Sequence, residues 1–164
     1  MLSAESAAGS YPVEAVAMMG RIIARTESHA AYRSIIHALR PDAETTAPHA
    51  VAAAAGDLAT AIGASAILVY TSSGVTASRV VRQRPDAPVL AFTPNDSVAR
   101  QMALLWGVHS VRSPVMQSYE EMVDHARLAA VGEGFAQRGG RILVVAGIPF
   151  GQSGTTNNLR VVDV

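Results

Sequence analysis

The sequence predicts a three-layer α/β/α domain whose five-stranded, mixed sheet is mostly parallel and ends in an antiparallel strand. The first reason is that short, continuous apolar runs alternate with helical patterns, which is typical of parallel strands covered on both faces by helices. The second reason is that the last two runs are joined by residues 149–157 alone. Because this connection is too short for a helical crossover, we expect the fifth strand to run antiparallel to the fourth.

Capping residues, prolines and glycines bound the expected helices. Pro12 favours the start of the first helix, and Gly63 ends an alanine-rich one. Further along, Thr93 offers a cap, Pro94 a first helical residue, and Gly107 closes the pattern. We therefore expect helices at residues 12–28, 46–62, 74–83, 94–106 and 118–137, whereas residues 30–39 form a short segment of ambiguous pattern.

The expected strands are the apolar runs between these helices. Pro88 is tolerated at the first residue of the second run, because a strand's first position does not require its N–H group. The last run alternates apolar and polar residues, as a half-buried strand does. The strands are expected at residues 66–70, 88–92, 109–112, 141–148 and 158–164.

Composition excludes several classes of protein. Hydrophobic residues make up 49% and charged residues 16% of the 164, so the chain is neither disordered nor a coiled coil. Thirteen basic and thirteen acidic residues balance, which gives no electrostatic case for nucleic acid or an anionic membrane as a partner. The chain has no cysteine, no apolar run near the roughly 20 residues of a membrane span, and no signal-peptide pattern at its start. We therefore expect a cytoplasmic protein.

The loop after the first expected strand is the best candidate for a binding site. A buried strand that gives way to hydroxyl residues and then a helix points N–H groups, hydroxyls and the positive end of a helix dipole at one spot. A glycine in such a loop lets an anion approach the backbone closely. The simpler alternative is ordinary capping of the following helix. The candidate phosphate-binding residues here are Thr71, Ser72, Ser73, Gly74 and Thr76.

A second loop of small residues leaves the carboxyl end of the fourth expected strand. Ligands of parallel α/β sheets gather beyond this edge, so we expect both loops to contribute to one anion site. The alternative is a wide hairpin that needs glycines for its turn. The candidate residues are Ser153, Gly154 and Thr155.

Several segments together carry a resemblance to one family. The chain opens with MLSAESAAGSYPVEAV at residues 1–16, followed by RPDAP at 84–88, FTPN at 92–95, VAG at 145–147 and SGTTN at 153–157. In this order and spacing, the segments resemble the end of the catalytic barrel and the C-terminal domain of pyruvate kinases. The resemblance implies that residues 1–28 are the end of the barrel and a linking helix, and that residues 29–164 are the C-terminal α/β domain. We expect a piece of a longer polypeptide, the alternative being a stand-alone relative of the domain.

The resemblance also implies a division of labour. The family's barrel transfers a phosphoryl group from phosphoenolpyruvate to ADP with magnesium and potassium, whereas the C-terminal domain takes part in oligomer contacts and, in regulated members, binds a phosphorylated effector. Only Ser3 and Glu5 belong to a segment that borders the family's active site. We therefore expect no catalytic residue, metal site or cofactor in this chain, and partners in the missing barrel, a phosphorylated effector and further copies of the chain.

The resemblance carries over to the effector loop residue by residue. Some family members have a lysine where Ser72 stands, and bisphosphate-binding members use a tryptophan and an arginine that align approximately with Val115 and Met122. Neither residue binds an anion, so we expect a sugar monophosphate and not a bisphosphate. A vestigial, unregulated loop is one alternative. Another is a stand-alone α/β enzyme or binding protein for a phosphorylated small molecule, although neither loop contains a carboxylate or histidine.

Overall fold

The computed structural model describes residues 1–39, 44–150, 152 and 154–164 of the chain. The chain divides into two compact units, Met1–Arg40 and Pro41–Val164, which are described separately below. The second unit holds the whole sheet and the candidate loops.

The first unit consists of helices α1 (Ala4–Ala7), α2 (Pro12–Glu27) and α3 (Ala30–Ala38). Pro12 occupies the first turn of α2, as its fixed φ and missing N–H group favour. The ambiguous segment proves to be helix α3. The short helix α1 was not expected from the sequence; the Glu5 carboxylate accepts hydrogen bonds from the N–H group and the hydroxyl of Ser3 at its start, both at 3.0 Å.

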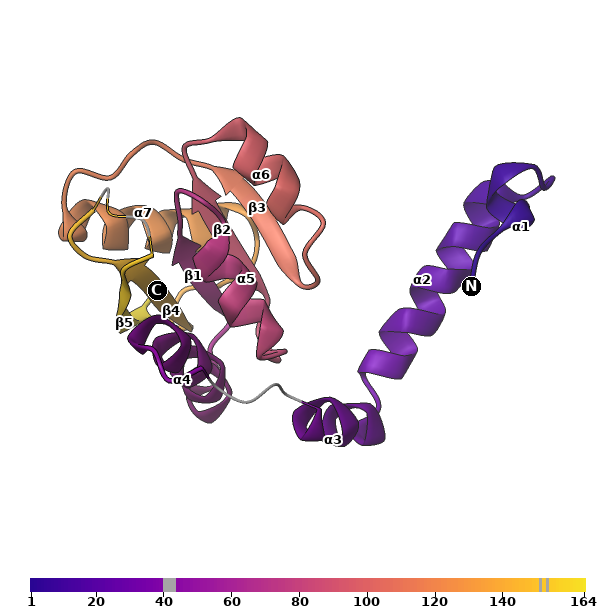
Figure 1. Ribbon diagram of the computed structural model, residues 1–164, viewed down its shortest axis with the longest axis horizontal. Helices are drawn as coiled ribbons and strands as arrows, with labels where there is room; N and C mark the ends of the chain where they lie inside the picture. Colours follow the sequence, from indigo (N-terminus) through magenta and orange to yellow (C-terminus); the bar gives the residue numbers. More distant parts are fainter. Residues whose placement is uncertain (40–43, 151, 153) are drawn as a thin grey trace. The chain divides into compact units, whose positions relative to one another are not determined.

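The second unit is a five-stranded sheet with helices on both faces (Figure 1). The strands lie in the order β3-β2-β1-β4-β5; β1 to β4 are parallel and β5 is antiparallel to β4, as the sequence predicts. The elements are α4 (Ala47–Ile62), β1 (Ala66–Tyr70), α5 (Val75–Arg82), β2 (Val89–Thr93), α6 (Asp96–Met102), β3 (Val108–Arg112), α7 (Tyr119–Gly132), β4 (Arg141–Gly147) and β5 (Thr156–Asp163).

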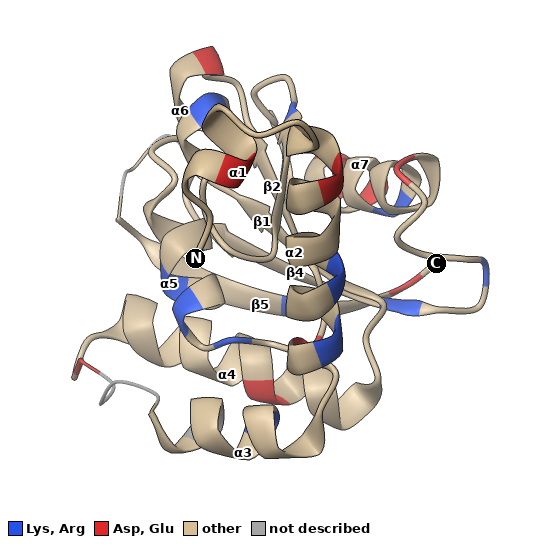
Figure 2. Ribbon diagram, turned by 90° about the vertical axis from the view of Figure 1, so that its right-hand side faces the viewer, with Lys and Arg blue, Asp and Glu red and all other residues tan. Residues whose placement is uncertain are grey.

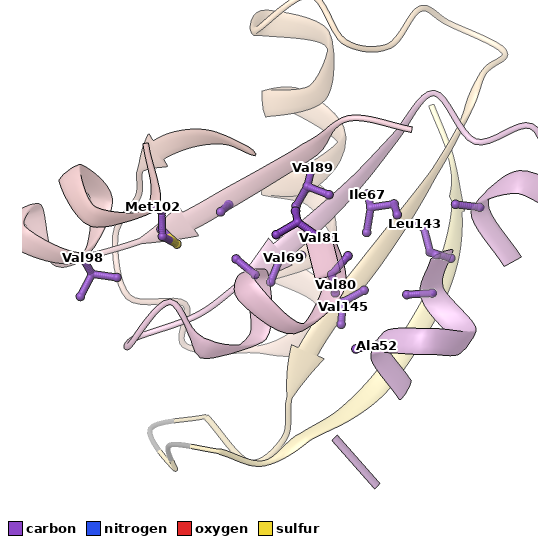
Figure 3. Packing of buried hydrophobic residues seen from close by; sticks show 14 residues of the cluster. Ala52, Ile67, Val69, Val80, Val81, Val89, Val98, Met102, Leu143 and Val145 are labelled. Atoms are coloured by element: carbon purple, nitrogen blue, oxygen red, sulfur yellow. The ribbon is translucent and has the colours of Figure 1, made fainter. Parts of the chain in front are cut away.

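Alternate residues of the strands pack into two separate cores, because successive side chains of a strand point to opposite faces. On one face Ile67 and Val69 of β1 pack with residues of α4, α5 and α6 (Figure 3). On the other face Leu68 packs with Phe92 of β2 and Met122 of α7. The neighbouring strands β1 and β2 contain no charged residue (Figure 2). The three-layer prediction is therefore confirmed.

Helix α6 differs from its prediction at both ends. Thr93 is the last residue of β2 and is fully buried, so it does not cap the helix. The cap is Asn95, whose side-chain oxygen accepts a hydrogen bond from the Ser97 N–H group at 3.0 Å. The helix ends at Met102 instead of residue 106. The turns that follow close through hydrogen bonds that span three residues instead of four, such as Leu104 N–H to the Gln101 carbonyl.

Helix α7 ends at Gly132, five residues before the predicted end at 137. Gly134 has a φ of +78°, a left-handed conformation that ends a helix. The next two N–H groups, of Phe135 and Ala136, both turn back to the Ala130 carbonyl. This turn buries Ala136 in the core beneath α7. Gly134 therefore ends the helix, and the later pair Gly139-Gly140 does not.

Candidate functional site

A cavity of about 230 Å³ lies where the carboxyl ends of β1, β2 and β4 meet. The loop after β1, the segment after β3 and the β4–β5 hairpin surround it. Its described lining residues are Tyr70, Thr71, Ser72, Ser73, Thr76, Phe92, Pro94, Ser113, Pro114, Val115, Met116, Ala146, Gly147, Phe150, Gln152, Gly154, Thr155 and Thr156. The two loops that the sequence singles out thus border one cavity.

One side of the cavity is rich in hydroxyl groups. Thr71 continues β1 by donating its N–H group to the Phe92 carbonyl at 3.0 Å, and its hydroxyl accepts a hydrogen bond from the Gly74 N–H group at 2.9 Å. This turn exposes Ser72 and Ser73 at the mouth of the cavity. The N-terminal end of α5 follows directly, so the positive end of its dipole lies on this side of the cavity.

Two buried threonines join this side to the sheet edge. The Thr76 hydroxyl in the first turn of α5 lies 2.7 Å from the Thr156 hydroxyl at the start of β5. Thr76 is 8% and Thr156 is 1% exposed, and both line the cavity. The hydrogen bond holds the β4–β5 hairpin against the first loop.

The hairpin itself is held by a close backbone approach. A Cβ atom on Gly147 would lie 2.7 Å from the Thr155 hydroxyl oxygen and 2.9 Å from the Thr155 carbonyl oxygen, so only glycine fits. The Asn157 amide closes the loop: its oxygen accepts from the Ile148 N–H group and its nitrogen donates to the Ile148 carbonyl. The hairpin therefore keeps Thr155 and Thr156 in place at the cavity wall.

The opposite side of the cavity is apolar and aromatic. The rings of Tyr70 and Phe92 stack with centroids 5.0 Å apart, and the buried Met116 lies beside them. The exposed Val115 borders the opening. A ligand in this cavity would therefore contact donors on one side and apolar surface on the other.

A chain of hydrogen bonds fixes Tyr70 in the wall of the cavity. Its hydroxyl lies 2.7 Å from His125 Nδ1 and 3.1 Å from the Met122 carbonyl. Both contacts are satisfied together when His125 Nδ1 carries a proton and donates to Tyr70, which donates to the carbonyl. Burial raises the pKa of Tyr70 and so keeps its hydroxyl neutral. Burial also lowers the pKa of His125, against the opposing effect of Glu121.

Six of the eight predicted site residues line the cavity. These are Thr71, Ser72, Ser73, Thr76, Gly154 and Thr155, whereas Ser153 lies outside the described residues. Gly74 does not line it, because a Cβ atom there would point at α6, 3.3 Å from Met102 Cγ. Its φ of +81° lies in the left-handed region, so the turn into α5 favours glycine at this position.

Several lining residues were missed by the sequence argument. Thr156 stands in the SGTTN segment beside a residue that was chosen, and its place at the start of β5 was the available signal. Tyr70 is the last residue of β1 and Phe92 the last but one of β2, and both look like ordinary core residues in the sequence. Of the two positions compared with bisphosphate-binding members, Val115 lines the cavity, whereas Met122 is fully buried in the core beneath α7.

The described lining of the cavity carries no charged side chain. Arg79, one turn after Thr76 on α5, is not part of it, and its buried Nη1 atom has no hydrogen-bond partner in the described structure. Within the described ranges, no group of three or more histidine, aspartate or glutamate side chains is arranged to hold a metal ion. None of the helices described combines the length and the apolar character needed to cross a membrane.

An α/β domain of this topology, with a hydroxyl-lined cavity at the carboxyl ends of its strands, has the architecture of a small-molecule-binding domain. The chain belongs to the pyruvate kinase family: residues 49–162 match the family model described as the pyruvate kinase alpha/beta domain. This confirms the resemblance and identifies the chain as containing the C-terminal domain of that family.

Three relatives illustrate the similarity. A pyruvate kinase of Agrobacterium vitis is 53% identical over 161 residues, which cover 98% of this chain and 34% of the relative. A pyruvate kinase of Methylorubrum extorquens is 44% identical with the same coverage, and one of Geobacillus stearothermophilus is 39% identical over 98% of this chain and 27% of the relative. The chain thus spans only 27% to 34% of the length of these three curated relatives.

Proposed function

We propose that this domain binds a sugar monophosphate in the cavity at the carboxyl ends of its strands and thereby regulates a pyruvate kinase of which it is part. The observation that carries the proposal is the two-sided cavity, with hydroxyl residues and the start of α5 on one side and an apolar wall on the other. The longer polypeptide would transfer the phosphoryl group from phosphoenolpyruvate to ADP in its barrel. This assignment rests on family membership.

The chemistry of the lining favours one phosphate group. Hydroxyls of Ser72 and Ser73 and the dipole of α5 stabilise a single anion at one end of the cavity. A second phosphate would face the end formed by Val115 and Met116, which offers no charge. Because burying an uncompensated charge is costly, a bisphosphate would gain no affinity from its second group.

Calorimetry on the full chain tests this proposal. We expect a hexose monophosphate to bind at least as tightly as fructose bisphosphate, and affinity to fall with salt. Ser72→Asp introduces a carboxylate at the mouth of the cavity and should weaken binding at least tenfold. Gln137→Glu adds the same charge at an exposed residue just before β4, at the opposite edge of the sheet, and should leave binding unchanged. Clearly tighter binding of the bisphosphate, or equal binding by Ser72→Asp, would contradict the proposal.

We also propose that the chain associates with a second copy through β5. This strand lies at the edge of the sheet and carries an exposed Val161, and open strand edges pair with one another. Light scattering should report a dimer that Val161→Lys dissociates. Val131→Lys on α7, which alters a valine of similar exposure (44% against 40%), should not dissociate it. A wild-type chain that remains monomeric at millimolar concentration would rule out this association.

No metal enters the proposal for this domain. The resemblance assigns the magnesium and potassium, and the cationic groups that phosphoryl transfer needs, to the barrel of the longer protein. We therefore expect the 164-residue chain alone to give no pyruvate from phosphoenolpyruvate and ADP in a coupled assay containing both cations. Turnover above the blank would show that catalytic groups are present in this chain after all.

A further inference from the structure

His125 of α7 lies against the aromatic wall of the cavity. Its ring meets the Phe92 ring at 83°, with centroids 5.3 Å apart, and its Nδ1 atom lies 2.7 Å from the Tyr70 hydroxyl oxygen. Tyr70 and Phe92 line the cavity, whereas His125 is absent from the described lining. A charge on this imidazole would therefore lie one side chain away from a bound ligand.

The hydrogen bonds around His125 are compatible with both of its charge states. With a proton on Nδ1, the ring donates to the Tyr70 hydroxyl, which donates to the Met122 carbonyl at 3.1 Å. The imidazolium keeps this proton and carries its second one on Nε2. Protonation therefore adds a charge without breaking the bonds that hold Tyr70.

The strands beneath α7 present uncharged side chains to the core that this helix covers. These are Tyr70 and Phe92 at the cavity, and Val111, Ile142, Val144 and Val162. Burial keeps Tyr70 neutral by raising its pKa, and the described lining of the cavity holds no charged side chain. An imidazolium at His125 would thus supply positive charge that the cavity itself lacks.

Two effects act on the charge of His125. Burial favours the neutral ring and lowers the pKa of His125, whereas the carboxylate of Glu121, one turn earlier on α7, opposes this shift. Further charged groups on or near α7 are paired or stacked elsewhere: Asp124 with Arg127, His109 with Glu133, and Arg160 over the ring of Tyr119. Because burial is the larger effect, the ring is neutral at pH 7 and gains its charge in acid.

We propose that His125 makes anion binding in this cavity depend on pH, as a cation that forms in acid beside the aromatic wall. This inference rests on the proposed binding of a monophosphate. A bound anion stabilises the imidazolium, so binding takes up a proton. Affinity for the anion therefore rises as the pH falls through the range in which His125 titrates.

Inorganic sulfate is a suitable probe, because it keeps both negative charges between about pH 5.5 and 7.5, whereas a phosphate monoester loses one as the pH falls through about 6. Calorimetry on the full chain should show an affinity for sulfate that is roughly three- to tenfold higher at pH 5.5 than at pH 7.5. An NMR titration should show the His125 ring taking up its proton at a higher pH with sulfate than without it.

Two variants remove the titrating group. His125→Gln and His125→Asn each keep an amide that can bond to Tyr70, and each should bind sulfate within about twofold at the two pH values. His109→Gln is the matched control, because it removes a histidine near the start of β3, at the other end of the sheet from the cavity, and should retain the full rise. Circular dichroism at both pH values reports whether each variant is folded.

The outcomes separate this inference from the proposed function. Equal affinity of the wild type for sulfate at the two pH values, or the same rise in both His125 variants, would refute the inference and leave anion binding intact. If neither variant folds, the NMR titration of the wild type decides, since a His125 signal that sulfate does not shift also refutes it. If the wild type binds neither sulfate nor a hexose monophosphate at either pH, the proposed function fails, and the role of His125 fails with it.

Discussion

Gly74 provides a sharp test of how the loop of the cavity is built. Its φ of +81° lies in the left-handed region, which costs a residue with a Cβ atom about 1–2 kcal/mol. The added methyl group would also lie 3.3 Å from Met102 Cγ and 3.4 Å from Val98 Cγ1, a tight fit against α6 that adds up to about 1 kcal/mol. Gly74→Ala should therefore lower the free energy of unfolding by about 2 kcal/mol.

Urea denaturation followed by circular dichroism measures this loss, and Gly134→Ala separates its two causes. Gly134 has nearly the same φ, +78°, but no atom within 4 Å of the position of a Cβ atom. This control should lose only the backbone contribution, about 1–2 kcal/mol. A Gly74→Ala variant as stable as the wild type would refute the argument from handedness. Equal losses at the two positions would show that contact with α6 adds nothing.

Three further predictions concern other parts of the domain. Gly147→Ala should lower the free energy of unfolding by at least about 2 kcal/mol and weaken phosphate binding, because its Cβ atom would clash with Thr155. Gly132→Ala has open space around the added methyl group and should leave urea denaturation and binding nearly unchanged. Gly56→Ala should stabilise α4 by up to about 1 kcal/mol in the same assay, since its nearest neighbour, 3.5 Å away, leaves room for a methyl group; a loss would mean that the helix packs more tightly than it appears. The lowered pKa of His125 means that the unfolded chain binds its proton more readily, so stability should be full above about pH 6.5 and fall as the pH drops through the folded-state pKa. His125→Gln should show a shallower fall between pH 7 and 5 in thermal unfolding, and an identical slope would exclude His125 as the cause.

The sheet could be predicted because its signal is local and strong. Strands such as β1, with the sequence AILVY, are apolar at nearly every position, and this happens where both faces of a strand are covered. The antiparallel β5 followed from the length of one connection. Helix ends were harder, because neighbouring residues compete for the cap: Thr93 is a good cap by type, but its backbone is already bound into β2, so Asn95 takes the role.

Only the polar side of the cavity could be predicted from the sequence. Hydroxyl residues and glycines after a strand stand out in a sequence, and the topology brings the loops after β1 and β4 to one edge because these strands are parallel neighbours. The apolar side comes from Tyr70, Phe92 and Met116. In the sequence these residues resemble any core residue, and only the folded sheet brings them next to the two loops. Gly74 shows a limit within the polar side itself: the sequence does not reveal that a Cβ atom there would point toward α6, because this direction follows from how the loop packs in the folded domain.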